Sequence, residues 1–254
     1  MLFMRPILLA VATLITLVAN TLAVVLPLNN RSTEAISDSF RVYFTPAGYV
    51  FSIWSVIYTA LIAFVVYSFF PRNRSNTAIQ AIFPWFMLSC AMNTAWIFLW
   101  HYGYYPLTML VMLGLLFSLV MVYIRLGIGT TTYTGSDFWC LRFTFSIYLG
   151  WICVATIANA TALLYDVQWS GFGISTEVWT SIMLVVAVAL GLIITETRND
   201  ALLVGVLLWA FIGIGVKHSA VPTVGISAWA AVVCTAMLVL RSIWISHRKR
   251  VQGA

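Results

Sequence analysis

Charged side chains are scarce in this sequence. Asp, Glu, Lys and Arg together make up 8% of the 254 residues, whereas a typical soluble domain carries about 25%. Hydrophobic residues make up 62% of the chain. The shortage of charge excludes an ordinary soluble globular protein and indicates a chain whose solvent is mostly lipid.

Cysteine and lysine are also few. Four cysteines lie in or beside hydrophobic stretches, without CxxC or CxxH spacing: Cys90, Cys140, Cys153 and Cys234. We expect them to be small buried residues, because this pattern supports neither a metal site nor a disulfide framework. The two lysines, Lys217 and Lys249, lie at the end of a hydrophobic stretch and in the C-terminal tail, which argues against a retinal Schiff base.

Long hydrophobic runs dominate the chain. A helix needs roughly 20 mostly apolar residues to cross a bilayer. Eight segments meet this need, at about 6–28, 47–70, 80–101, 106–126, 141–165, 176–195, 200–216 and 222–246. The first run exceeds the ~7–15 residues of a signal-peptide core, so we expect a retained helix. The sequence predicts an all-α integral membrane protein of about eight transmembrane helices, because lipid-exposed backbone must satisfy its own hydrogen bonds.

Positive charges fall mostly on one side of this arrangement. With eight spans, ten of the thirteen Lys and Arg residues share a side with both termini: Arg5, Arg72, Arg74, Arg125, Arg142, Arg198, Arg241, Arg248, Lys249 and Arg250. The positive-inside rule then predicts cytoplasmic N- and C-termini in a plasma (inner) membrane. Topology therefore accounts for the net charge of +6, and we infer no nucleic-acid partner.

Three hydrophobic segments carry aromatic and polar residues at helical spacing. The sets are Trp54 and Tyr58 in the second segment, Asn93, Trp96 and Trp100 in the third, and Tyr148, Trp151, Ala155 and Asn159 in the fifth. Each set falls on one face of a helix. Trp and Tyr favour the two membrane interfaces, but Trp54, Trp96 and Trp151 lie several residues inside their segments. The sequence therefore predicts that these faces point into the helix bundle.

The two asparagines within these faces allow two interpretations. An amide that faces lipid loses hydrogen bonds at a cost of a few kcal/mol, so we expect Asn93 and Asn159 to face the interior. They serve either as bonds between helices or as polar groups of a ligand pocket walled by aromatic rings. The residues alone leave these alternatives equal.

The same residues carry a resemblance to a known family. Tyr148, Leu149, Trp151, Ala155 and Asn159 match the pattern Y-L-x-W-x-x-x-A-x-x-x-N, and Asn93 and Trp96 match N-x-x-W. Pro46, Trp54 and Tyr58 match a third pattern, in which Trp and Tyr follow a proline by eight and twelve residues. Over about residues 1–166, the chain resembles the tryptophan-rich sensory protein / translocator protein (TspO/MBR) family.

This resemblance implies a fold and a ligand. The family forms a five-helix bundle, often a dimer, that binds porphyrins and other flat hydrophobic molecules among its helices. It implies a pocket lined by Trp54, Asn93, Trp96, Trp151, Ala155 and Ala158. Tyr58, Tyr148 and Asn159 lie on the same helix faces and complete the predicted ligand site, although Asn159, one turn further along its helix, is the member for which a structural role is most expected. The resemblance also implies that residues 29–46, which we call the lid, cover this site; a solvated linker is the alternative for this segment.

The chain also departs from the family pattern. Gly48, Ser52 and Ile147 stand where the family has a tryptophan and two prolines, and no tyrosine–arginine cholesterol motif follows Asn159. These changes affect the lid and the mouth of the pocket, which is compatible with a different ligand. We expect a TspO/MBR-like bundle at 1–166, three additional transmembrane helices at 167–246 and a basic cytoplasmic tail at 247–254.

Other function classes remain open. A secondary transporter of a small solute usually keeps an ionisable group in mid-membrane, but the acidic residues beyond the lid lie at the ends of predicted spans. A structural membrane partner subunit is a further alternative. An enzyme is less favoured, because the three histidines have no suitably spaced acid or cysteine partner. The preferred hypothesis is a membrane-embedded protein that binds a porphyrin-like ligand for sensing or translocation.

Overall fold

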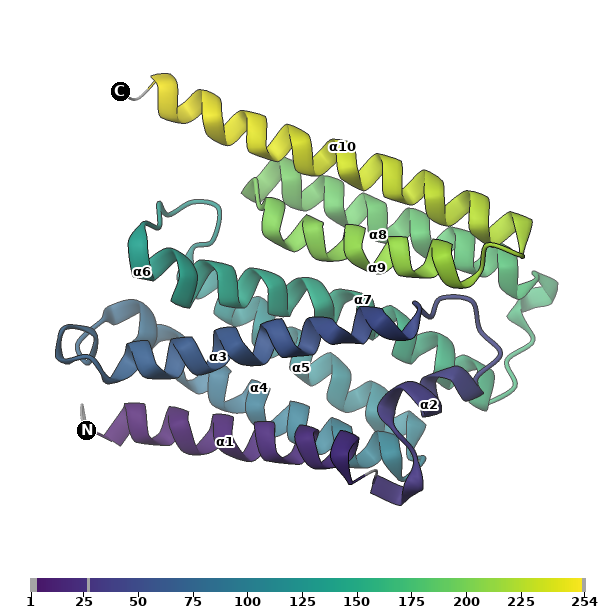
Figure 1. Ribbon diagram of the computed structural model, residues 1–254, viewed down its shortest axis with the longest axis horizontal. Helices are drawn as coiled ribbons and strands as arrows, with labels where there is room; N and C mark the ends of the chain where they lie inside the picture. Colours follow the sequence, from purple (N-terminus) through teal and green to yellow (C-terminus); the bar gives the residue numbers. More distant parts are fainter. Residues whose placement is uncertain (1–3, 27, 253–254) are drawn as a thin grey trace.

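The computed structural model describes residues 4–26 and 28–252, and its long elements are all α-helices (Figure 1). Seven stretches within this described part are long and apolar enough to cross a membrane. They contain α1 (Met4–Val25), α3 (Ile53–Phe69), α4 (Thr77–His101), α5 (Tyr105–Leu126), α7 (Thr144–Asp166), α8 (Thr176–Arg198) and α10 (Pro222–Gln252). The α3 stretch begins with a 3-10 turn at Gly48–Ser52, and the α7 stretch begins with α6 (Gly135–Asp137) and a π-helical turn at Phe138–Phe143.

The expectation of eight spans needs one refinement. The predicted segment 200–216 is helical but forms the shorter α9 (Ala201–Lys217), with 17 residues. At 1.5 Å per residue, such a helix is about 25 Å long, which is at the lower limit for crossing the hydrocarbon. Among the described residues, the structure therefore supports seven long candidate spans and one short apolar helix. The final residues of the expected tail, 253–254, lie outside the described part.

The helices form two groups that meet along α7 and α9. In the first group, α4 packs against α1 and α5, while α7 packs against α3 and α5. In the second group, α10 packs against α8 and α9. The helices of the second group lie together beside α7 in Figure 1. A Cβ atom added to Gly150 of α7 would lie 3.0 Å from the Leu203 carbonyl oxygen of α9, so the missing side chain permits this close approach.

The two ends of the bundle differ. The start of α1 and the end of α10 lie at the same end of the bundle, and the short helix α2 (Thr33–Ser39) lies at the opposite end (Figure 1). The Ser32 hydroxyl caps α2 by accepting a hydrogen bond from the Ala35 amide at 3.1 Å. The lid is therefore partly helical, and its residues line a cavity together with the aromatic faces of α3, α4 and α7.

Candidate functional site

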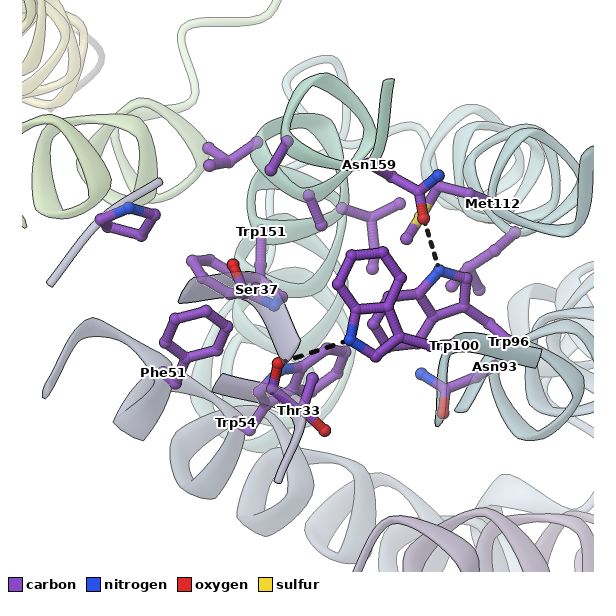
Figure 2. Close-up of a pocket in the computed structure, with 16 residues that line it drawn as sticks. Thr33, Ser37, Phe51, Trp54, Asn93, Trp96, Trp100, Met112, Trp151 and Asn159 are labelled. Atoms are coloured by element: carbon purple, nitrogen blue, oxygen red, sulfur yellow. Dashed lines mark hydrogen bonds between the residues drawn. The ribbon is translucent and has the colours of Figure 1, made fainter. Parts of the chain in front are cut away.

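A cavity of about 50 Å³ lies where the predicted aromatic faces meet. Trp54 comes from α3, Trp96 from α4 and Trp151 from α7, while the lid adds Thr33, Ser37 and Pro46 (Figure 2). Seven of the nine predicted site residues line it: Trp54, Asn93, Trp96, Trp151, Ala155, Ala158 and Asn159. The helical spacing seen in the sequence thus brings three helix faces to one place.

The tryptophans meet in fixed ring contacts. Trp54 and Trp151 lie edge to face, with ring centroids 6.1 Å apart and planes at 83°. Trp96 stacks on Trp100 at 5.2 Å and 20°. Such arrangements place the negative face of one ring near the positive edge of another, or offset two parallel rings. The result is a set of flat apolar walls at different orientations around one small space.

Trp151 has an unused hydrogen-bond donor. Its side chain is 3% exposed, and its Nε1 atom has no hydrogen-bond partner among the described residues. A buried indole N–H without an acceptor costs free energy. An acceptor atom supplied by a bound molecule would remove that cost. The Trp151 indole N–H is therefore available to donate a hydrogen bond to a ligand.

Asn93 belongs to a chain of hydrogen bonds that joins three helices. Its Oδ1 atom accepts from Asn20 Nδ2 of α1 at 2.8 Å. Its Nδ2 atom donates to the Tyr148 hydroxyl of α7 at 2.9 Å. Tyr148 is buried and does not line the cavity; it supports Asn93 from behind. Asn20 was recognisable in the sequence only as a polar residue of the first span, because its partner lies 73 positions away.

Asn159 is likewise occupied by neighbouring helices. Its Oδ1 atom accepts from Trp96 Nε1 of α4 at 2.8 Å, and its Nδ2 atom donates to the Thr108 hydroxyl of α5 at 3.1 Å. The bond to Trp96 is drawn in Figure 2. Both asparagines therefore connect helices, and both also line the cavity.

Part of the cavity wall lies outside the predicted ligand site. Trp100 is buried and donates from Nε1 to the Thr33 carbonyl oxygen of the lid at 3.4 Å (Figure 2). Phe51 precedes α3 and lies edge to face with Trp151 at 5.9 Å. Trp100 shares the helical face of Asn93 and Trp96, so its position was recognisable. The lid residues have no periodicity that could have assigned them.

A larger cavity of about 440 Å³ adjoins the first between α1 and α3. The two share Thr33, Phe51, Trp54 and Trp96 as lining residues. Tyr58, the ninth predicted residue, lines this second space and stacks on Trp54 at 5.2 Å and 25°. Seven of the nine predicted site residues therefore line the smaller cavity, and Tyr58 lines the larger one. Tyr148 lines neither cavity and bonds to Asn93.

Gly48, which stands where the family has a tryptophan, lies beside the Glu34 side chain. A Cβ atom added at this position would lie 1.8 Å from the Glu34 carboxylate of α2. Both residues line the larger cavity. A larger residue at position 48 would therefore require the Glu34 side chain to move.

The second helix group holds the lid. Lys217 at the end of α9 forms an ion pair with Asp38 and donates to the Pro46 carbonyl oxygen at 3.4 Å. The Ala47 amide donates to the Gly213 carbonyl oxygen at 3.1 Å. A Cβ atom at Gly213 would lie 2.2 Å from Val50 Cγ2, so α9 approaches this segment as closely as its missing side chain permits.

His218 adds a titratable contact to the lid. Its Nε2 atom lies 3.0 Å from the Thr45 carbonyl oxygen, to which it donates, and its ring meets Tyr43 edge to face at 5.3 Å. Burial lowers the pKa of His218 below its ordinary value of 6.5, and nearby Lys217 lowers it further. The Thr45 carbonyl and Asp38 oppose this shift. The neutral imidazole is therefore the form that this site favours.

Comparison with known proteins identifies the family of this chain. A family model described as TSPO-like protein matches residues 6–244, which include both helix groups. No curated protein and no solved structure matches the chain. With its apolar helices, the chain is a multi-pass membrane protein and belongs to the TSPO-like protein family.

Proposed function

We propose that this protein binds a flat hydrophobic molecule, such as a tetrapyrrole, among α3, α4 and α7, and that binding serves sensing or movement across the membrane. The observation that carries this proposal is the convergence of Trp54, Trp96 and Trp151 on one cavity, with the Trp151 N–H free for an acceptor. Ring faces bind a flat apolar molecule by dispersion, and a buried donor orients its polar edge.

The size of the cavity sets a requirement for binding. Ligand sites usually measure about 300–1,000 Å³, whereas this cavity measures about 50 Å³. The adjoining cavity measures about 440 Å³ and shares the rings of Trp54 and Trp96. Because the two cavities share lining residues, these residues must move for one ligand to occupy both spaces. The proposed ligand therefore extends from Trp151 toward Tyr58, and the lid moves when it binds.

The proposed orientation places the cavities near the outer surface. Lys217 and the lid lie at the end of the bundle opposite the start of α1. Positive charge gathers at the other end, which the positive-inside rule assigns to the cytoplasm. In this orientation, the lid covers the cavity from the outside, and a ligand enters from the outer aqueous phase or the outer leaflet.

Titration with protoporphyrin IX tests the site. We expect saturable quenching of tryptophan fluorescence and about tenfold weaker binding for Trp151→Ala, with smaller losses for Trp54→Ala and Trp96→Ala, because each removes a stacking surface. Trp244→Ala is the control, since Trp244 lies exposed on α10 away from the cavity. Unchanged affinity in all three cavity variants would overturn the site assignment.

A flux measurement separates the two roles. Purified protein in proteoliposomes either carries the porphyrin across the bilayer or only binds it. Ligand-dependent flux that Trp151→Ala abolishes assigns translocation. Binding without flux assigns sensing.

A further inference from the structure

A separate cavity of about 310 Å³ lies between the two helix groups. One wall is a face of α7 with Thr156, Ala160 and Leu164, and the opposite wall is a face of α8 with Thr176, Trp179 and Met183. Its volume is at the lower end of the range for small-molecule sites. This space is about six times larger than the cavity at Trp151.

The cavity arises from the way the two groups pack. Helix α9 packs against both α7 and α8, whereas α7 and α8 make little direct contact. Trp151, Ala155 and Asn159 occupy a different face of α7 and line the first cavity. Helix α7 is therefore a wall between two cavities, and the second exists only because the additional helices are present.

The aromatic side of this cavity is held in place. Trp169 and Trp179 lie with ring centroids 5.1 Å apart at 53°. Trp179 Nε1 donates to the Gly171 carbonyl oxygen at 2.9 Å, which fixes the indole ring and uses its polar group. Tyr43 of the lid adds a further ring. Fixed rings lose little conformational entropy when a ligand binds, so they form a ready surface for an aromatic molecule.

Three threonines on the two helix walls contribute hydrogen-bond acceptors to the cavity. The hydroxyls of Thr156, Thr161 and Thr180 donate to backbone oxygens of their own helices at 2.7, 2.8 and 2.8 Å. Their oxygen atoms retain the capacity to accept a hydrogen bond but not to donate one. The described residues that line the cavity include no Asp, Glu, Lys, Arg or His. A charged group of a ligand would have no oppositely charged partner among these residues, and burying it would cost free energy.

We infer that this cavity binds a small uncharged aromatic molecule with a hydroxyl or ring N–H group, of the phenol or indole type. The rings of Trp169, Trp179 and Tyr43 contact its faces, and threonine oxygens accept its hydrogen bond. This assignment does not depend on the proposed porphyrin site. It gives the additional helices a role, because α8 supplies half of the binding surface.

Calorimetric titration of the full chain in lipid nanodiscs with 2-naphthol tests the inference, after subtraction of the heat from empty nanodiscs. The expected result is saturable binding with one molecule per chain. Naphthalene-2-carboxylate has the same rings but carries a negative charge and no donor, and we expect it to bind at least about tenfold more weakly. Equal affinity for the two probes, or no saturable binding of 2-naphthol, overturns the inference.

Matched substitutions on two faces of one helix locate the site. Ala160→Phe fills the second cavity, and Ala155→Phe fills the first. We expect Ala160→Phe to weaken 2-naphthol binding about tenfold and Ala155→Phe to change it by less than about twofold. Equal losses in the two variants overturn the assignment. If Ala160→Phe does not fold, the triple substitution Thr156→Val, Thr161→Val and Thr180→Val removes the three threonine acceptors at nearly constant shape, and unchanged affinity there also overturns it.

Protoporphyrin IX distinguishes this inference from the proposed function. The same variants should respond in the opposite order, with Ala155→Phe losing the porphyrin and Ala160→Phe retaining it. If neither variant nor wild type binds the porphyrin while 2-naphthol follows the expected pattern, the proposed function fails and the second site stands.

Discussion

At the scale of single residues, the buried amides connect helices while also facing a cavity. Asn159 contacts α4 through Trp96 and α5 through Thr108. Asn93 contacts α1 and α7 in the same way. Because lipid provides no competing hydrogen bonds, an amide in a membrane bundle is best placed where two partners reach it. Trp151 differs from both, since its N–H has no partner among the described residues.

The role of Asn159 can be measured directly. Asn159→Leu keeps the approximate volume but leaves Trp96 Nε1 without its acceptor. We expect a loss of about 1 kcal/mol in the free energy of unfolding, the usual scale for such bonds in membranes, as measured by denaturant unfolding in detergent. Thr156→Val is the control, because Thr156 bonds only to its own helix. Unchanged stability with lost porphyrin affinity would instead assign the amide to the ligand.

His218 makes the attachment of the lid sensitive to pH. Its pKa is lowered in the folded protein, so the folded state binds a proton less readily than the unfolded state. The resulting stabilisation is fully present above pH 6.5 and is lost as the pH falls from 6.5 through the folded pKa. Protonation would also place a second positive charge beside Lys217.

Comparison with His218→Gln tests this dependence. Glutamine can donate to the Thr45 carbonyl but does not titrate in this range. Between about pH 7.5 and about pH 5.5, the thermal midpoint of the wild type should fall relative to that of the variant. Parallel profiles for the two proteins would show that His218 does not titrate in the lid contact.

At the scale of elements, α9 is the centre of the second group. It contacts α7, α8 and α10, and its C-terminal end holds the lid through Lys217. The glycines at its interfaces permit these close approaches, as Gly213 does toward Val50. Helix α9 therefore links α8 and α10 to the lid of the aromatic cavity.

The ion pair of Lys217 with Asp38 should limit lid motion. Lys217→Met removes it while keeping an extended side chain, and we expect roughly twofold to fivefold faster hydrogen exchange in residues 38–47, since exposed pairs contribute about 0–1 kcal/mol. Arg241→Met removes a comparable exposed pair with Glu196 away from the lid and serves as the control. The exchanged pair Lys217→Asp with Asp38→Lys should restore slow exchange. Equal exchange in both methionine variants would contradict a role for the pair.

At the scale of the whole molecule, the two ends of the bundle differ in structure. The lid and the cavities of about 50, 310 and 440 Å³ lie toward one end. The start of α1 and the end of α10 lie at the other end. Both helix groups contribute to covering or lining these spaces. The family match across residues 6–244 fits a single unit that includes the additional helices.

Cysteine labelling tests the proposed orientation. Ala35→Cys lies on exposed α2 of the lid, and Thr132→Cys lies on the exposed loop after α5, at the opposite end. In intact cells, a membrane-impermeant maleimide should label the first variant but should label the second only after permeabilisation. The wild type gives the background from its four native cysteines. The reverse labelling pattern would place the termini outside.

Several elements of the molecule could be predicted from local patterns. The helical segments followed from apolar length, and Pro106 fell in the first turn of α5 as its fixed φ favours. The shared cavity of Trp54, Trp96 and Trp151 followed from their spacing and from the family resemblance. The resemblance implied a lid at residues 29–46, but the contacts of the lid with Lys217 and Trp100 and the partner of Asn20 could not be predicted, because these partners are distant in sequence and follow no period.

The sequence by itself determined that this is a helical membrane protein, which helix faces point inward and which family it resembles. These properties depend on local composition and periodicity, since the bilayer imposes helix length and inward polarity on each segment separately. Only the tertiary structure decided that α7 separates two cavities, that α9 holds the lid and that Asn159 is already bonded to Trp96 and Thr108. Such features depend on how helices pack side by side, and packing is set by side-chain shape and hydrogen-bond partners across the whole chain.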